Sequence, residues 1–98
     1  MPMKSPPYPG RLVKTSIGEL CVSVAEAATA LGISRAQLHR IVGCESSISP
    51  EMAIRLEAVI GSTADAWLRL QAAHDAAAIR ARADEITRGL KRIVAPAA

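Results

Sequence analysis

The chain has 98 residues, a formal net charge of +3 and an apolar fraction of 50%. This apolar fraction excludes a disordered protein, and the length suits a single domain with a modest core. Tyr8 and Trp67 are the only aromatic residues, and no stretch alternates apolar and polar residues as a half-buried strand would. We therefore expect an all-α protein with a core of aliphatic residues and alanine.

A proline-rich segment opens the chain and predicts a flexible arm over residues 1–8, with Tyr8 available as an anchor. A first helix is expected from about Pro9 to Gly18. Its apolar residues, and those that follow it, are expected to face the core: Leu12, Val13, Leu20 and Val22.

The stretch from Ser23 to Val42 has the pattern of two short helices joined by a tight turn. Ser23 and Ser34 each precede a helix with the spacing of a capping box, and Gly32 is placed to end the first helix. Apolar residues recur in the first helix at the positions of one buried face: Val24, Ala27, Ala28 and Leu31. This arrangement predicts a helix-turn-helix unit, whose second helix enters the major groove of DNA.

The second helix of this unit is predicted to turn a polar face to DNA. Leu38, Ile41 and Val42 give it a buried side. The outward residues, which are the candidate DNA-binding residues, are Arg35, Ala36, Gln37, His39 and Arg40. Arginine on this face can read guanine, yet residues 23–49 contain two arginines and two glutamates, so charge alone does not favour DNA. The alternative is a pair of packed helices with no nucleic-acid partner.

The loop after the second helix begins at Gly43, which is placed to end that helix. Ser46 in this loop is a candidate donor to a DNA phosphate or else a solvated residue, and the sequence leaves both open.

A further helix is expected to begin at Ser49, with Pro50 at its first position and Glu51 in its first turn. Gly61 is placed to end it. The residues expected to be buried are Met52, Ala53, Leu56, Val59 and Ile60, and those expected to lie outward are Arg55 and Glu57.

The next helix, expected over about residues 63–83, is apolar on two sides. Ala64, Trp67 and Leu68 form the side that faces the core. Because a helix that is apolar on two sides is normally covered on both, we expect the other side to form a homodimer interface. Its candidate residues are Leu70, Ala73, His74 and Ala77. The alternative is a monomer in which the end of the chain folds back over this side.

Residues 76–98 are predicted to form a C-terminal helical extension. A short separate helix is expected to begin near Thr87. Its apolar stripe would consist of Ile86, Leu90, Ile93 and Val94, opposite the basic residues Arg88, Lys91 and Arg92. The basic side can be a solvated face, a phosphate contact or a partner surface.

No residue pattern in the chain indicates catalysis, a cofactor or a metal site. His39 and His74 each lack a second ligand at metal-binding spacing, and Cys21 and Cys44 have no close partner. The start of the chain lacks the apolar segment of a secretory signal, and no apolar run approaches the roughly 20 residues of a membrane span. We therefore expect a non-enzymatic, cytoplasmic protein with reduced thiols and no membrane contact.

Four segments resemble the HigA (VapI-type) antitoxins, a group within the lambda-repressor-like, XRE-type helix-turn-helix family. They are Pro9-Gly10, A-L-G-I-S-R-A-Q-L at 30–38, I-S-P-E-M-A-I-R-L at 48–56 and A-W-L-R-L-Q-A-A at 66–73. The last two segments are the more specific ones. The resemblance covers about residues 9–75 and implies a lambda-repressor-like domain of five helices there.

The resemblance also implies a function. The chain would be the antitoxin of a type II toxin–antitoxin pair that neutralises a RelE/HigB-like ribonuclease toxin. As a homodimer it would also repress its own operon by binding double-stranded operator DNA. By likeness, the groove-facing positions are Ser34, Arg35, Ala36, Gln37, His39 and Arg40, and Ser23 lies where a phosphate contact is usual. Glu45 departs from the basic loop of many relatives. The alternatives are a protein-interaction module or a plain transcriptional repressor with no toxin partner.

Overall fold

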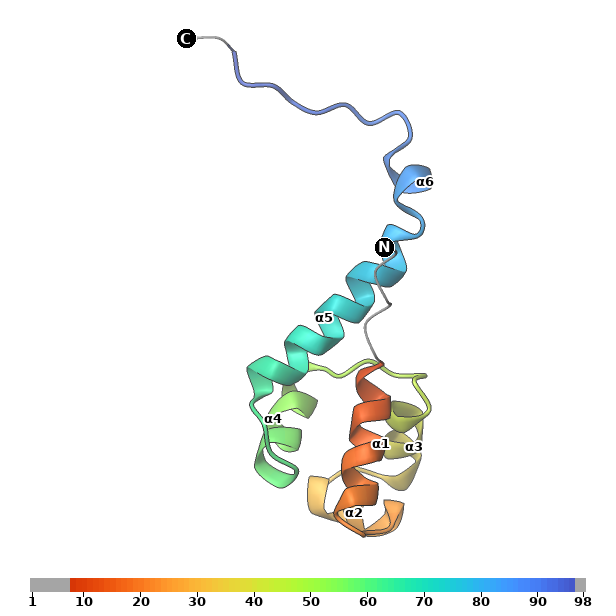
Figure 1. Cartoon of the computed structure of the whole chain (residues 1–98), viewed down its shortest axis with the longest axis vertical. Helices are drawn as coiled ribbons and strands as arrows, with labels where there is room; N and C mark the ends of the chain where they lie inside the picture. Colours follow the sequence, from red (N-terminus) through yellow and green to blue (C-terminus); the bar gives the residue numbers. More distant parts are fainter. Residues whose placement is uncertain (1–7, 97–98) are drawn as a thin grey trace.

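The computed structural model describes residues 8–96, which form six α-helices and, within that range, no strand (Figure 1). The helices are α1 (Pro9–Glu19), α2 (Val24–Leu31), α3 (Arg35–Val42), α4 (Pro50–Val59), α5 (Ala64–Arg80) and α6 (Ala83–Thr87). The predicted all-α fold is confirmed, with five helices in the domain and α6 beyond them. The predicted flexible arm, apart from Tyr8, lies outside the described residues.

The helices α1 to α4 and the first half of α5 form a bundle, and the rest of the chain extends away from it (Figure 1). In the bundle, α3 packs against α1 and α2, while α5 packs against α4 and α1. The radius of gyration is 17.7 Å, compared with about 13 Å for a compact domain of roughly 100 residues. The difference arises because the end of α5, α6 and the residues after α6 leave the bundle.

The core of the bundle is aliphatic, as the composition predicts. Its buried residues are Val13, Ile17, Ala27, Ala28, Leu31, Leu38, Ile41, Ile48, Met52, Ala53, Leu56, Ala64 and Trp67. Trp67 is the one aromatic residue among them, and its indole N–H donates to the carbonyl oxygen of Gly61 at 3.1 Å. This bond satisfies a polar group that burial would otherwise penalise.

Hydroxyl side chains begin four of the helices. Ser23, Ser34, Ser49 and Thr63 each accept a hydrogen bond from the backbone N–H three residues further on. At Ser23 the capping box is complete, because the Glu26 carboxylate also accepts from the Ser23 N–H. The predicted starts of α2, α3, α4 and α5 are confirmed, since each cap uses only neighbouring residues.

Residues with positive φ follow the first four helices, and three of these residues are not glycine: Cys21, Cys44 and Ser62. Gly32 and Gly61 have φ of 72° and 118°, as expected for residues that end α2 and α4. The helix α3 ends at Gly43, as predicted, but Gly43 has a φ of −84°, and Cys44 after it takes the left-handed conformation with φ 63°. Cys21 does the same after α1, with φ 57°.

Ile60, which was expected in the core, is half-buried and packs against it, but two other residues expected there are more exposed than predicted. Leu20 is 53% exposed and Val59 is 39% exposed. Each lies at the end of its helix or just after it, where fewer elements surround a side chain than in the middle of the bundle. Val22, which was also expected to face the core, packs against it.

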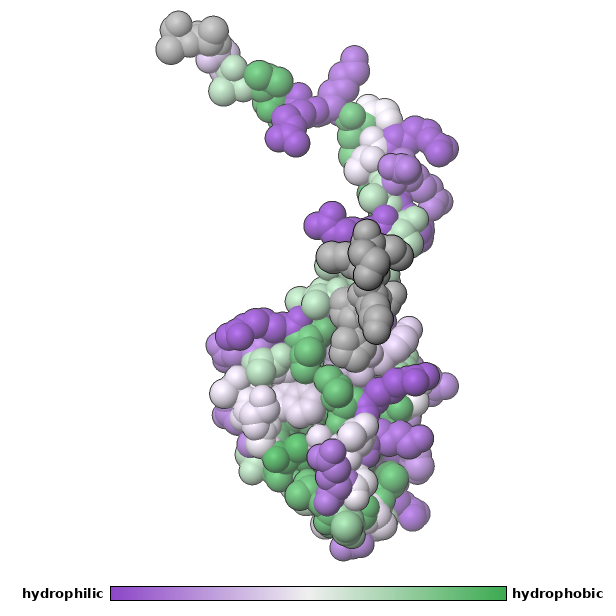
Figure 2. All heavy atoms as spheres, in the orientation of Figure 1, coloured by the Kyte–Doolittle hydropathy of each residue, from purple (hydrophilic) through white to green (hydrophobic). Residues whose placement is uncertain are grey.

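The predicted helix beginning near Thr87 is wrong. The structure instead has α6, which ends at Thr87, and residues 88–96 form no helix. Gly89 has a φ of 82°, and Leu90, Ile93 and Val94 are 70%, 95% and 78% exposed. Residues 88–96 pass no other described element against which a helix could pack (Figure 2), and Gly89 interrupts them, so nothing offsets the entropy cost of a helix there.

Candidate nucleic-acid interface

The helices α2 and α3 form the predicted helix-turn-helix unit. Ala28 is 1% exposed, and its lack of a long side chain lets α3 cross α2 closely. The turn is fixed by Gly32 in the left-handed conformation and by a hydrogen bond of 3.0 Å from the Ile33 N–H to the Ala28 carbonyl oxygen. Ser34 then caps α3 by accepting from the Gln37 N–H at 3.0 Å.

One face of α3 is exposed and polar. The five outward candidates for DNA contact are all exposed: Arg35, Ala36, Gln37, His39 and Arg40. On the opposite side, Leu38 and Ile41 are 0% and 2% exposed. The structure therefore brings these five residues together on a surface that is free, within the described chain, to meet a partner.

The three candidate serines differ in exposure and in hydrogen bonding. Ser23 and Ser34 are exposed, and each hydroxyl accepts from a backbone N–H, which leaves its own proton available to donate to an anion. Ser46 is half-buried, and its backbone N–H donates to the Arg40 carbonyl oxygen at 3.1 Å. The loop thus folds back onto the end of α3 instead of extending from it.

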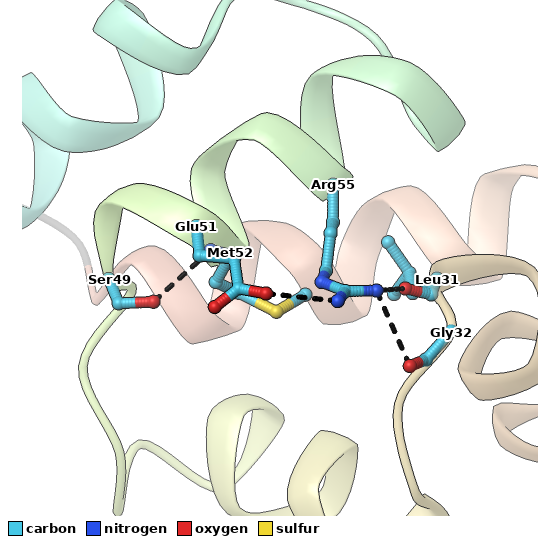
Figure 3. Close-up of polar contacts among 6 residues, drawn as sticks. All are labelled: Leu31, Gly32, Ser49, Glu51, Met52 and Arg55. Carbon is cyan, nitrogen blue, oxygen red and sulfur yellow. Dashed lines mark hydrogen bonds and ion pairs between the residues drawn. The ribbon is translucent and has the colours of Figure 1, made fainter.

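Arg55 on α4 supports the turn between α2 and α3 (Figure 3). Its Nη1 donates to the carbonyl oxygens of Leu31 at 2.8 Å and Gly32 at 3.4 Å. Its Nη2 pairs with Glu51 Oε1 at 3.0 Å. Because the last carbonyls of a helix lack partners within the helix, the guanidinium group caps α2. The sequence placed Arg55 outward, and nothing local reveals a contact between residues 24 positions apart.

Gly10 fixes how closely α1 approaches α3. It is buried, and a Cβ atom built on it collides with the carbonyl oxygen of Ile41. Only glycine permits this crossing, so Gly10 helps to hold the buried side of α3 in place. Sequence reasoning used Gly10 only as part of a family resemblance, and the steric requirement becomes visible when the two helices are packed.

Gln71 connects α5 to the loop that precedes α4. It is 9% exposed, and its Oε1 accepts from the Ile48 backbone N–H at 2.8 Å. Its side-chain nitrogen donates to Asp75 Oδ1, also at 2.8 Å. The sequence analysis assigned no structural role to Gln71. Glu57, which was expected to lie outward, is exposed and also accepts from the Ala64 N–H at 2.9 Å at the start of α5.

The candidate dimer residues lie along α5. Leu70, His74 and Ala77 are half-buried, and Ala73 is exposed. The ring of His74 contacts the ring of Tyr8, with the centroids 3.9 Å apart, so Tyr8 does serve as an anchor. Leu70 packs against the core of the bundle, so two of the four candidates, Leu70 and His74, are already engaged within their own chain.

Residues 8–96 contain no group of three or more His, Cys, Asp or Glu side chains that could hold a metal ion. None of the helices described there is long and apolar enough to cross a membrane.

Comparison with known proteins places this helix-turn-helix unit in a family. No family model matches the chain. Over 74 residues the chain is 42% identical to virulence-associated protein A′ of Dichelobacter nodosus, covering 74% of this chain and 64% of that relative's length. Over 71 residues it is 41% identical to the uncharacterised HTH-type transcriptional regulator YddM of Escherichia coli K12, covering 72% of this chain and 76% of that protein.

A solved structure extends the likeness to almost the whole fold. The antitoxin HigA of Pseudomonas aeruginosa, solved with the higBA promoter, superposes with a TM-score of 0.80 and 30% identity. The match covers 91% of this chain and 99% of the Pseudomonas chain. The chain belongs to the HigA-type antitoxin family. This confirms the family predicted from the sequence. It also confirms that the chain is not an enzyme, since its relatives are antitoxins and helix-turn-helix regulators.

Proposed function

We propose that this HigA-family protein is an antitoxin that binds operator DNA through α3 and represses its own operon. One observation carries the proposal: the exposed face of α3 presents Arg35, Gln37 and Arg40 together, backed by the buried Leu38 and Ile41. A helix held in this way can enter a major groove and read base edges. The Pseudomonas relative solved with promoter DNA supports the same use of the fold.

Fluorescence anisotropy tests the DNA part of the proposal. The probes are a duplex from the region upstream of the gene and a scrambled duplex of equal length, each titrated over a range of salt concentrations. We expect tight binding to the first duplex, weaker binding to the second, and affinity that falls steeply with salt. Equal, weak binding to both would favour the rival function, a protein-interaction module that keeps the helix-turn-helix as a scaffold.

A substitution in α3 separates base reading from phosphate contact. Arg40→Ala is expected to weaken binding to the upstream duplex more than to the scrambled one, because a bidentate contact to guanine is worth about 1–3 kcal/mol of discrimination. Arg69→Ala, on the exposed side of α5, removes the same charge away from α3 and serves as the control. Equal weakening on both duplexes would assign Arg40 to a phosphate.

The second part of the proposal is a homodimer formed through Leu70, Ala73, His74 and Ala77. The second half of α5 leaves the bundle (Figure 1). On it, Ala73 is exposed and Ala77 is half-buried, so this part of α5 has surface that a second copy of the chain can cover. A dimer would also double the basic contacts to DNA, which a net-neutral unit over residues 23–49 needs.

Sedimentation equilibrium with paired variants tests this interface. Ala73→Glu with Ala77→Glu places two carboxylates on the candidate face and is expected to yield a monomer. Ala72→Glu with Ala76→Glu, at the same spacing on another side of α5, is the matched control and should leave the dimer intact. If only the control pair dissociates the dimer, the interface lies on that other side of α5.

The third part of the proposal is neutralisation of a RelE/HigB-like ribonuclease toxin. The family supports it, because the Pseudomonas relative is an antitoxin. The test is to purify the protein encoded next to this gene, measure its ribonuclease activity, and add this chain in increasing amounts. Stoichiometric loss of activity is expected. Undiminished activity, together with selective DNA binding, would indicate a plain transcriptional repressor.

A further inference from the structure

A basic hollow lies beside the end of α3, on the side of α1. Its open space of about 610 Å³ is lined by Arg11, Lys14 and Thr15 from α1 and by Val42, Gly43 and Cys44 from the end of α3 and the loop. Tyr8 completes the lining. Because α1 packs directly against α3, the hollow and the candidate DNA-reading face belong to neighbouring surfaces of one rigid unit.

The hollow is positively charged and its charges are unused. Arg11 and Lys14 are exposed, and neither takes part in the ion pairs of the described residues, which join Arg55 to Glu51 and Arg82 to Glu85. Among residues 8–96, no carboxylate lines the hollow. Long basic side chains with no acidic partner can bind an external anion at little cost.

Arg11 and Lys14 carry the positive charge of the hollow. The Thr15 hydroxyl donates to the Arg11 carbonyl oxygen at 3.0 Å, so its proton is not available to an anion. Glu45 and Asp75 line a separate depression, which shares Tyr8 and Cys44 with the basic hollow. The charge that attracts an anion to the hollow is therefore that of Arg11 and Lys14.

We propose that Arg11 and Lys14 bind the phosphate backbone of duplex DNA that passes the C-terminal end of α3. This inference rests on the proposed DNA binding and adds a phosphate-binding site on α1. Only Ile41 separates Arg40 from the segment Val42 to Cys44 that lines the hollow. A DNA backbone beside the groove that holds α3 therefore passes this hollow. Phosphate contacts of this kind fix the orientation of a protein on DNA without reading its sequence.

The charge balance of the helix-turn-helix unit favours DNA over an acidic protein as the partner of this hollow. Residues 23–49 have equal numbers of arginine and glutamate residues, although duplex binding depends on neutralising several phosphates. Arg11 and Lys14 add two positive charges beside a unit that otherwise has no excess. They therefore supply what the helix-turn-helix unit lacks for the function proposed for it.

The test compares two double variants with equal loss of charge. Arg11→Gln with Lys14→Gln alters the basic hollow, and Arg88→Gln with Lys91→Gln removes an arginine and a lysine from the exposed segment after α6. Each variant and the wild type are titrated against the upstream and scrambled duplexes over a salt series. Circular dichroism melts check that both variants remain folded, as expected for substitutions at exposed residues that form no ion pair.

We expect the α1 variant to lower affinity for both duplexes by the same factor. The slope of log affinity against log salt should become shallower by about 0.9 for each lost phosphate contact. The ratio of affinities for the two duplexes should not change, because these contacts carry no sequence information.

An unchanged salt slope in the α1 variant, with selective binding by the wild type, would overturn the inference and leave the proposed function standing. Equal changes in both double variants would also overturn it, since only overall charge would then matter. If the α1 variant keeps its DNA binding but loses inhibition of the neighbouring gene's ribonuclease, the hollow binds a protein instead. Failure of the wild type to select the upstream duplex counts against the proposed function.

Discussion

Replacing Arg55 by methionine is expected to lower the free energy of unfolding by about 2 kcal/mol. Methionine keeps much of the aliphatic stem and removes the hydrogen bonds from the guanidinium group to the carbonyls of Leu31 and Gly32. A hydrogen bond from a charged group contributes about 1.5–3 kcal/mol. The lower part of this range applies here, because the Arg55 side chain is 38% exposed and the contact to Gly32 is long at 3.4 Å.

The ion pair between Arg55 and Glu51 contributes little to this expected loss in the free energy of unfolding. The Glu51 side chain is 78% exposed, and an exposed pair four residues apart on a helix contributes about 0.3–0.5 kcal/mol. Glu51→Gln therefore serves as the control and should cost less than 1 kcal/mol. The measurement is urea denaturation of both variants, with the same slope expected for each. An equal loss in the two variants would show that the ion pair, and not the cap on α2, is what Arg55 contributes.

Three further substitutions test other contacts. Gly10→Ala is expected to cost at least about 3 kcal/mol by thermal denaturation, because its Cβ meets the backbone of Ile41; a loss below 1 kcal/mol would mean that α1 moves freely. Cys21→Gly should raise stability by about 0.5–1 kcal/mol in urea, since glycine relieves the left-handed φ of 57°, and no gain would contradict this. Gln71→Ala should cost about 1–3 kcal/mol by leaving the buried N–H of Ile48 unpaired, whereas an unchanged melt would show that water replaces the side chain.

The helix-turn-helix unit could be predicted because its signals are local. The caps at Ser23 and Ser34 bind amides three residues away. Gly32 turns the chain at its own position with a φ of 72°. The periodic apolar residues of α3 then decide which side faces the core, and Arg35, Gln37 and Arg40 are left outward as predicted. Hydrogen bonds and periodicity that span a few residues can be identified in a sequence without knowing the fold.

The end of the chain shows where the same reasoning fails. The apolar and basic residues after Ile86 have helical spacing, yet the described chain is not helical there. Periodicity states which side of a helix would be apolar, but it does not supply a surface for that side to pack against. Without such a surface, a short segment interrupted by Gly89 remains extended.

The sequence by itself determined the fold class, the starts of four helices and the polar face of α3, because each depends on residues close together in the chain. Tertiary structure alone decided the contacts that hold this face in position. Arg55 caps a helix 24 residues away, Gln71 binds a loop 23 residues away, and Gly10 admits the backbone of Ile41. Only packing brings these pairs together, so no local pattern marks them. The same packing brings α1 across α3, and so places Arg11 and Lys14 beside the end of α3.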